Sequence, residues 1–200
     1  MVYKTAKKAL FVAGLAFCAS TTAVAEGMTG ASASMLANTC AGCHGTNGAS
    51  VGPAAPTIGG MSEDYFIDVM ERFASGEVPS TIMGRIANGY SGEEIEKMAG
   101  FYAEQEFVPA KQEYDAGQAK TGAKLHEMYC EKCHEDGGTL DDGTSRLAGQ
   151  WKTYLEWTMA DITAQHREVG RKMWRKVEDM MNKQGEESIS EVINYYASQQ

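Results

Sequence analysis

Apolar residues recur at helical spacing through most of the chain after residue 25. Ile95, Met98 and Tyr102 fall on one face of a predicted helix. A similar face near the C-terminus comprises Ile189, Val192, Ile193 and Tyr196. No stretch has the composition of a convincing strand, so the pattern predicts an all-α fold.

Polar residues mark where several of these helices begin. Ser62 is a predicted N-cap because Glu63 and Asp64 follow it and favour the first turn of a helix. Ser91 and Glu94 have the spacing of a capping box, which predicts that a helix starts just after Ser91. Glycine and proline predict loops over 52–56 and 76–82, and a Gly/Asp-rich loop is expected over 137–144. A further helix is expected over 151–158.

The chain carries the pattern Cys-x-x-Cys-His twice. The copies are Cys40, Cys43 and His44, and Cys130, Cys133 and His134. This is the attachment pattern of c-type haem. Two intervening residues let both thiols reach one porphyrin edge, and the next residue can then place an imidazole under the iron. The pattern predicts two covalently bound haem c groups.

Two other chemistries use paired cysteines. Four cysteines in two pairs can bind zinc, but the long gap between the pairs and the histidine after each one count against this. A thioredoxin-like redox pair needs a strand–helix alternation around the motif, and neither copy has one.

The two motifs belong to an internal repeat. Met83 lies 43 positions after the first cysteine of its motif, and Met173 lies 43 positions after the first cysteine of the other. Each methionine is followed two residues later by an arginine, Arg85 or Arg175. These arginines could each pair with a haem propionate or lie in solvent. The final helices are offset by 94 rather than 90 residues, so the second copy has about four extra residues before its final helix.

The repeat predicts two tandem haem domains, at 26–108 and 121–200, joined by a polar linker at 109–120. Each domain is small enough that apolar burial alone is marginal, and a covalently held haem would complete its core.

Residues 1–25 are predicted to be a signal peptide, with three lysines, an apolar stretch and an Ala-x-Ala cleavage signal. The apolar stretch is too short for a transmembrane anchor, so we expect an exported, periplasmic protein with no membrane span. Removing the three lysines takes the formal net charge from −9 to −12. This charge argues against nucleic acid as a partner and weakly favours a basic partner protein.

His44 and His134 are the predicted proximal iron ligands, since the thioether positions fix where they lie. Met83 and Met173 are the predicted sixth ligands because of their equal spacing. His/Cys ligation is excluded, because the haems use every cysteine outside the signal peptide. For the second haem the alternatives are Met159, Met180, Met181 and His166.

Several stretches resemble the dihaem cytochrome subunit of flavocytochrome c sulfide dehydrogenase. They are NTCAGCHG (38–45), STIMGRIA (80–87), TGAKLH (121–126), YCEKCH (129–134), LAGQW (147–151) and YASQQ (196–200). They span nearly the whole chain after the signal peptide, whereas 137–146 departs from the family.

The resemblance implies tandem class I cytochrome c-like domains with the ligands named above. It also implies a separate flavoprotein subunit, in which FAD oxidises sulfide, and a soluble cytochrome c that accepts the electrons. The chain would then have no catalytic residues of its own. The alternatives are a free dihaem carrier between a membrane complex and a terminal oxidase or reductase, and a haem enzyme with an open iron site.

Overall fold

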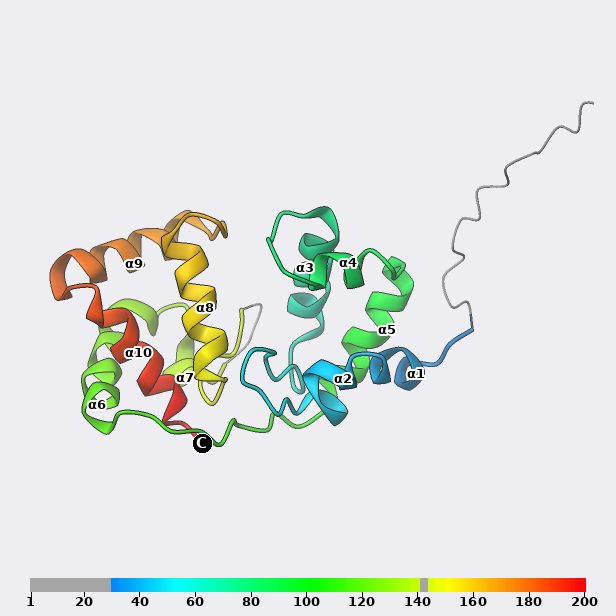
Figure 1. Cartoon of the computed structure of the whole chain (residues 1–200), viewed down its shortest axis with the longest axis horizontal. Coiled ribbons are helices and arrows are strands. Elements are labelled where there is room, and N and C mark those ends of the chain that lie inside the picture. The colour runs from blue at the N-terminus through cyan, green and yellow to red at the C-terminus, as the bar shows by residue number, and fades with distance from the viewer. Residues whose placement is uncertain (1–29, 141–143) are drawn as a thin grey trace, which may run out of the picture.

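The computed structural model describes residues 30–140 and 144–200, and within these ranges every regular element is a helix (Figure 1). The predicted all-α class is therefore confirmed. The predicted signal peptide lies outside the described residues.

The first half of the chain forms one domain. Its elements are α1 (Ala33–Asn38), α2 (Ala41–His44), the 3₁₀ turn η1 (Thr46–Gly48), α3 (Glu63–Ser75), α4 (Met83–Ala87) and α5 (Gly92–Ala103). Ser62 occupies the N-cap position of α3, as predicted. The Ser91–Glu94 capping box at the start of α5 is also confirmed, with both of its reciprocal hydrogen bonds formed.

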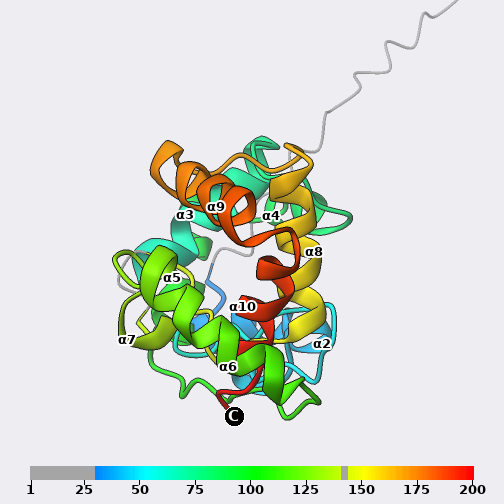
Figure 2. The same ribbon diagram turned by 90° about the vertical axis from the view of Figure 1, so that its left-hand side faces the viewer.

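The second half repeats this order. Its elements are α6 (Ala116–Leu125), the π-helical turn η2 (His126–Cys130), α7 (Glu135–Gly138), α8 (Lys152–Thr163), α9 (Arg171–Gln184) and α10 (Glu187–Ala197). Figure 2 views the molecule from the side of this domain, with α6, α8, α9 and α10 in front. Met173 lies in the first turn of α9.

In each domain the last helix crosses the first. In the first domain the Tyr102 hydroxyl of α5 donates to the carbonyl of Ala37 in α1 at 2.7 Å, and both residues are buried. In the second domain Tyr196 of α10 holds the corresponding place in a core that includes Leu125 and Ile193. The apolar faces predicted from periodicity are the faces that meet here.

At the crossing of α6 and α10 the two backbones come into close contact at Gly122. A Cβ on this residue would overlap the carbonyl of Glu191. The helix pair can approach this closely only because the position has no side chain.

Gly122→Ala is therefore expected to destabilise the second domain by about 1–3 kcal/mol, through forced separation of α6 and α10. Thermal unfolding of the haem-loaded protein would measure this. Gly100→Ala in α5 is the matched control. Its Cβ would enter nearly open space, so this helix-interior change should leave stability unchanged or raise it by up to about 1 kcal/mol. Equal effects of the two variants on stability would contradict the inference that the crossing of α6 and α10 requires glycine at Gly122.

The segment between the domains makes specific contacts with the second domain. Helix α6 already begins at Ala116, inside the predicted linker. Upstream of it, Ala110 is buried and donates its backbone N–H to the carbonyl of Gly149 at 2.8 Å. The connection thus lies against the second domain.

Candidate haem sites

The first motif forms a single helical turn. Cys40 caps α2, and its carbonyl accepts the backbone N–H of His44 at 2.9 Å. Both thiols are free, with Cys40 half-buried and Cys43 exposed. The turn therefore places two unpaired thiols and an imidazole on one short stretch of backbone.

The His44 ring is held by the loop that follows the motif. Its Nδ1 lies 2.9 Å from the carbonyl of Pro56, to which it donates. Burial lowers the pKa of His44, and the Pro56 hydrogen bond only partly opposes this. The ring is thereby kept neutral with the lone pair on Nε2, which is the form that ligates a metal.

The second motif has the same local geometry. The carbonyl of Cys130 accepts the backbone N–H of His134 at 3.0 Å, and both of its thiols are free. Burial is again the main cause that lowers the pKa of His134, and electrostatic repulsion from His126 lowers it further. The backbone of Ser145 favours protonation of this ring, but no hydrogen bond of standard geometry reaches the buried Nδ1.

Ser145 occupies the position in the second repeat that corresponds to Pro56, whose carbonyl accepts the hydrogen bond of His44. It lies 89 positions after Pro56, the same offset that relates the loops around it. The second domain has no proline. The carbonyl that faces His134 could have been found by aligning the loops of the two repeats instead of seeking a proline. A buried ring nitrogen facing such a carbonyl is the arrangement that orients a ligating histidine.

These features fit a covalently attached haem at each motif. Each site supplies two free thiols and a neutral imidazole whose Nδ1 is turned toward a backbone carbonyl. A zinc site shared by the two pairs would need four converging ligands. No group of three or more His, Cys, Asp or Glu side chains converges in this way within 30–140 and 144–200.

The predicted sixth ligands both lie at the start of a helix. Met83 is the first residue of α4, is half-buried, and contacts the core of the first domain. The Ser80 hydroxyl accepts the N–H of Gly84 at 2.8 Å and fixes the start of this helix. Met173 is half-buried in the first turn of α9. Iron ligation by Met83 and Met173 stays a prediction.

The alternative ligands of the second domain lie in different surroundings. Met180 is buried in the core, and His166 is exposed in the turn after α8. Met159 and Met181 line a groove of about 400 Å³ between α8, α9 and α10. In the first domain the equivalent residues Met70 and Ile95 are both buried.

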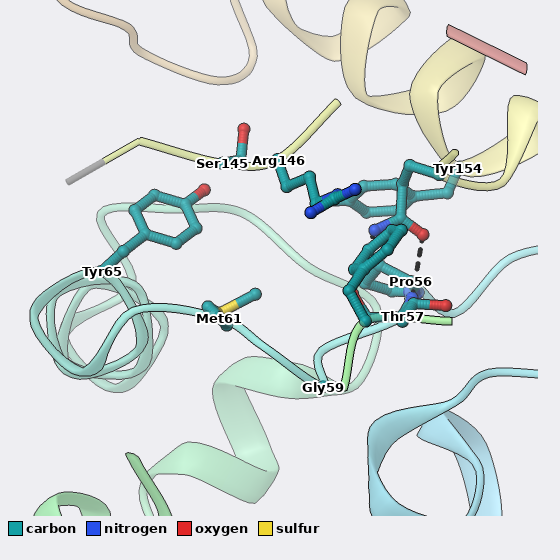
Figure 3. Close-up of a pocket in the computed structure, with 10 residues that line it drawn as sticks. Pro56, Thr57, Gly59, Met61, Tyr65, Ser145, Arg146 and Tyr154 are labelled. Atoms are coloured by element: carbon teal, nitrogen blue, oxygen red, sulfur yellow. Dashed lines mark hydrogen bonds between the residues drawn. The ribbon is translucent and has the colours of Figure 1, made fainter. Parts of the chain in front are cut away.

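The predicted haem sites lie on either side of a shared domain boundary. A cavity of about 30 Å³ at this boundary is lined by equivalent residues of the two repeats (Figure 3). The equivalent pairs, related by 89 positions, are Pro56 and Ser145, Thr57 and Arg146, Met61 and Gln150, and Tyr65 and Tyr154. The loops that carry the histidine-facing carbonyls of both domains therefore meet here.

Buried polar contacts fasten this boundary. The Gln150 side chain accepts the N–H of Thr57 at 2.8 Å and donates to the Thr57 carbonyl at 3.0 Å. Trp151 adds a hydrogen bond from its indole N–H to the carbonyl of Ser50 at 3.2 Å. Arg146 lies 4.1 Å from the centre of the Phe107 ring. The relative placement of the two sites is thus set by paired polar groups, none of which the sequence pattern identified.

Sequence reasoning also missed His126, a buried residue of the second domain. Its Nδ1 lies 2.8 Å from the Tyr196 hydroxyl and its Nε2 lies 2.5 Å from a Glu131 carboxylate oxygen. The carbonyl of His126 accepts the N–H of Glu131 at 2.8 Å, which forms the π-helical turn leading into Cys130. The equivalent position in the first domain is Leu36, so this network belongs to the second site alone.

The His126 contact is the largest cause of the lowered pKa of Glu131. A carboxyl group whose pKa is depressed in the folded state stabilises the fold above its unfolded pKa and loses this effect as pH falls through the folded pKa.

His126→Leu, which copies the first domain, is expected to lower stability near neutral pH by about 1–3 kcal/mol, because the Tyr196 hydroxyl loses a buried partner. The destabilisation should shrink on acidification below the usual Glu range, where Glu131 no longer contributes. Thermal unfolding followed over pH measures both effects. Leu36→Val in the first domain is the control, which should show no such pH dependence. A loss of stability in His126→Leu that stays constant across the acidic range would contradict a stabilising contact between His126 and Glu131.

No protein-family model matches the chain. A 47-residue segment, 24% of the chain, is 43% identical to the cytochrome subunit of sulfide dehydrogenase from Chlorobaculum tepidum. The match covers 43% of that protein, so the chain spans less than half the length of this curated relative.

The solved structures decide the fold. Cytochrome c4 of Pseudomonas stutzeri is similar over 81% of this chain and 94% of its own, with a TM-score of 0.68 at 22% identity. Cytochrome c4 of Acidithiobacillus ferrooxidans is similar over 81% and 99%, with a TM-score of 0.69 at 20% identity. This is the tandem fold of a dihaem cytochrome c.

The same dihaem cytochrome fold occurs within a larger protein. Thiosulfate dehydrogenase (TsdBA) of Marichromatium purpuratum is similar over 80% of this chain but only 36% of its own, with a TM-score of 0.68 at 21% identity. The predicted class of two tandem class I cytochrome c domains is confirmed. No described helix has the length and apolar character needed to cross a bilayer.

Proposed function

We propose that the protein is a periplasmic dihaem electron carrier, which takes electrons from a flavoprotein subunit that oxidises sulfide and passes them to a soluble cytochrome c. The main support for the proposal is that two equivalent thiol–imidazole sites lie on either side of one domain boundary, which buried hydrogen bonds hold together. Such an arrangement gives electrons an internal route between two centres.

The chain's residues would act by holding and tuning two haem groups. The cysteines Cys40, Cys43, Cys130 and Cys133 would attach them, His44 and His134 would ligate iron on one side, and Met83 and Met173 on the other. A haem iron with both axial positions filled exchanges single electrons without binding a substrate, and thioether ligation raises its potential. The boundary contacts of Thr57 and Gln150 would keep the two centres at a fixed separation.

The sulfide-oxidising partner is supported by the matched segment of the Chlorobaculum tepidum protein, a cytochrome subunit of sulfide dehydrogenase. It is supported further by the stretches of the sequence that resemble the cytochrome subunit of flavocytochrome c sulfide dehydrogenase. The flavin and the sulfide chemistry would then lie in the partner chain.

A free dihaem carrier is the second candidate. Its support is the coverage of the two cytochromes c4, whose chains are matched over 94% and 99% of their length. A protein of this kind would need no permanent flavoprotein.

The two candidates are separated by gentle purification from the native periplasm. Haem and flavin spectra would be recorded on the protein peak, and sulfide-dependent reduction of cytochrome c would be assayed on the same fractions. Co-migrating flavin with that activity is the expected result. A flavin-free dihaem protein that is reducible but inert to sulfide would overturn the sulfide proposal and leave the free carrier.

A further inference from the structure

Positive charge is concentrated on one short part of the second domain. Five of the chain's 18 lysines and arginines lie within ten residues of an otherwise acidic protein. They form what we call the basic patch: Arg167, Arg171, Lys172, Arg175 and Lys176. All are exposed except Arg167, which is half-buried. Glu168 is the one carboxylate in the same stretch.

The fold makes little use of these charges. Within 30–140 and 144–200, the salt bridges of lysine and arginine involve Arg72, Lys97, Lys152 and Lys183, and none involves the basic patch. The side chain of Lys176 lies 6.0 Å from the centre of the Tyr129 ring, which is a weak contact.

The position of the patch is also unfavourable for helix stability. The first turn of α9 contains Arg171 and Lys172 and no acidic residue, although the N-terminal end of a helix disfavours positive charge. Arg171 and Arg175 are four residues apart, as are Lys172 and Lys176, and like charges at this spacing repel. Local stability therefore does not explain the cluster.

The first domain has no counterpart. The stretch equivalent to 167–176 is 77–86, which contains one cation, Arg85, and one carboxylate, Glu77. Both stretches include the predicted methionine ligand of their domain. The charge difference thus separates the surfaces near two otherwise equivalent sites.

The patch lies on the outer side of the molecule. Helix α9 runs along the upper edge of the second domain in Figure 1 and stands in front in Figure 2. Met173 lies on this helix between the exposed cations Lys172 and Arg175. A protein that contacted the patch would therefore sit against the predicted sixth-ligand side of the second haem site.

We propose that the basic patch is the docking surface for an acidic electron-transfer protein that exchanges electrons with the second domain. This rests on the proposed electron-carrier function and names one class of partner for it. Unpaired surface cations attract carboxylates over roughly the 8–10 Å that salt leaves unscreened, and they steer a diffusing partner to the right face. The net negative charge of the rest of the chain repels the same partner elsewhere, which directs binding to α9.

A small acidic protein fits this charge pattern better than an anionic membrane. A bilayer presents an extended negative surface, which the acidic remainder of the chain would face as well. A protein with a local carboxylate cluster needs to contact only α9.

The test compares two triple variants of the haem-loaded full chain. The patch variant carries Arg171→Gln, Lys172→Gln and Arg175→Gln. The control carries Lys111→Gln, Lys120→Gln and Lys124→Gln, which removes the same charge from exposed positions outside α9. The Met–iron absorption band and the midpoint potentials of both variants would be recorded first, so that a disturbed haem site is recognised independently of docking.

The probes are an acidic blue-copper protein and a basic cytochrome c of the mitochondrial type. Dissociation constants and second-order electron-transfer rates would be measured at low and high ionic strength. For the acidic probe the patch variant should lose about ten-fold or more in rate and affinity at low salt, with a flatter salt dependence, since steering of this kind spans roughly 10–10³-fold. The control should change less than about two-fold for the same number of charges removed. The basic probe should not be slowed by the patch variant.

Equal losses in the patch and control variants would overturn the docking surface. Binding of the wild-type protein to phosphatidylserine vesicles, lost in the patch variant, would overturn it in favour of a membrane surface. Neither outcome depends on sulfide, so the sulfide proposal can fail in its own assay while this one stands.

Discussion

Met83→Ala is expected to abolish the Met–iron absorption band of the first haem and to lower its midpoint potential strongly. Axial ligands set haem potentials over roughly 0.8 V, and loss of a thioether removes the ligand that raises the potential. Met173→Ala is expected to do the same to the second haem. Each variant should leave the other haem unchanged, because the two methionines belong to different domains.

Controls for these variants come from methionines on the protein surface. Met35 and Met128 are 63% and 54% exposed, so their replacement by alanine should change neither the band nor the potential. If Met173→Ala leaves the band intact, Met159→Ala and Met181→Ala would identify the ligand, since both line the groove of the second domain. A band that survives Met83→Ala would refute the assignment in the first domain.

The double variant Cys130→Ser with Cys133→Ser is expected to yield a one-haem protein whose second domain is unfolded. Among the described residues of that domain, the main cluster of buried apolar side chains is small and comprises Leu125, Leu155, Met180, Val192, Ile193 and Tyr196. A domain of this size is marginal without additional core, which the haem would supply. Limited proteolysis and haem content would be measured together.

The expected cleavage lies in the second domain, with the first domain intact and loaded. The matched variant Cys40→Ser with Cys43→Ser should reverse the pattern. Two haems retained after either double substitution, or a protease-resistant domain without its haem, would contradict the account.

The repeat and the local signals carried most of the fold prediction. The capping box at Ser91 and Glu94 sets the start of α5 through contacts three residues apart, which a sequence displays directly. Periodicity likewise exposed the buried face of α10 that includes Val192 and Ile193. Such features depend on near neighbours in the chain.

Features that depend on distant partners were not predicted. The Thr57–Gln150 pair joins residues 93 positions apart, and nothing in the local pattern marks either of them. The local sequence indicates only that His126 is a polar residue at the end of a helix. Its surroundings in the fold include Tyr196 from α10, whose hydroxyl lies within hydrogen-bond distance. The π-helical turn there follows from the same contacts. The greater length of α9 compared with α4 had no signal in the sequence beyond the longer offset.

Haem attachment at the two Cys-x-x-Cys-His motifs and iron ligation by His44 and His134 stay predictions. The contact of His44 with the carbonyl of Pro56 joins residues 12 positions apart. The ligation by Met83 and Met173 is a prediction that absorption spectra of the variants will decide.

Each chain is expected to carry two covalently attached haems, one per Cys-x-x-Cys-His motif. The most direct test is the intact mass of the denatured protein purified from its native periplasm, with a pyridine haemochrome assay on the same sample. The account predicts a mass increase of two haem groups over the processed chain, and haem-bearing peptides that contain Cys40–Cys43 and Cys130–Cys133. A chain with no covalent haem, or with haem at only one motif, would contradict it.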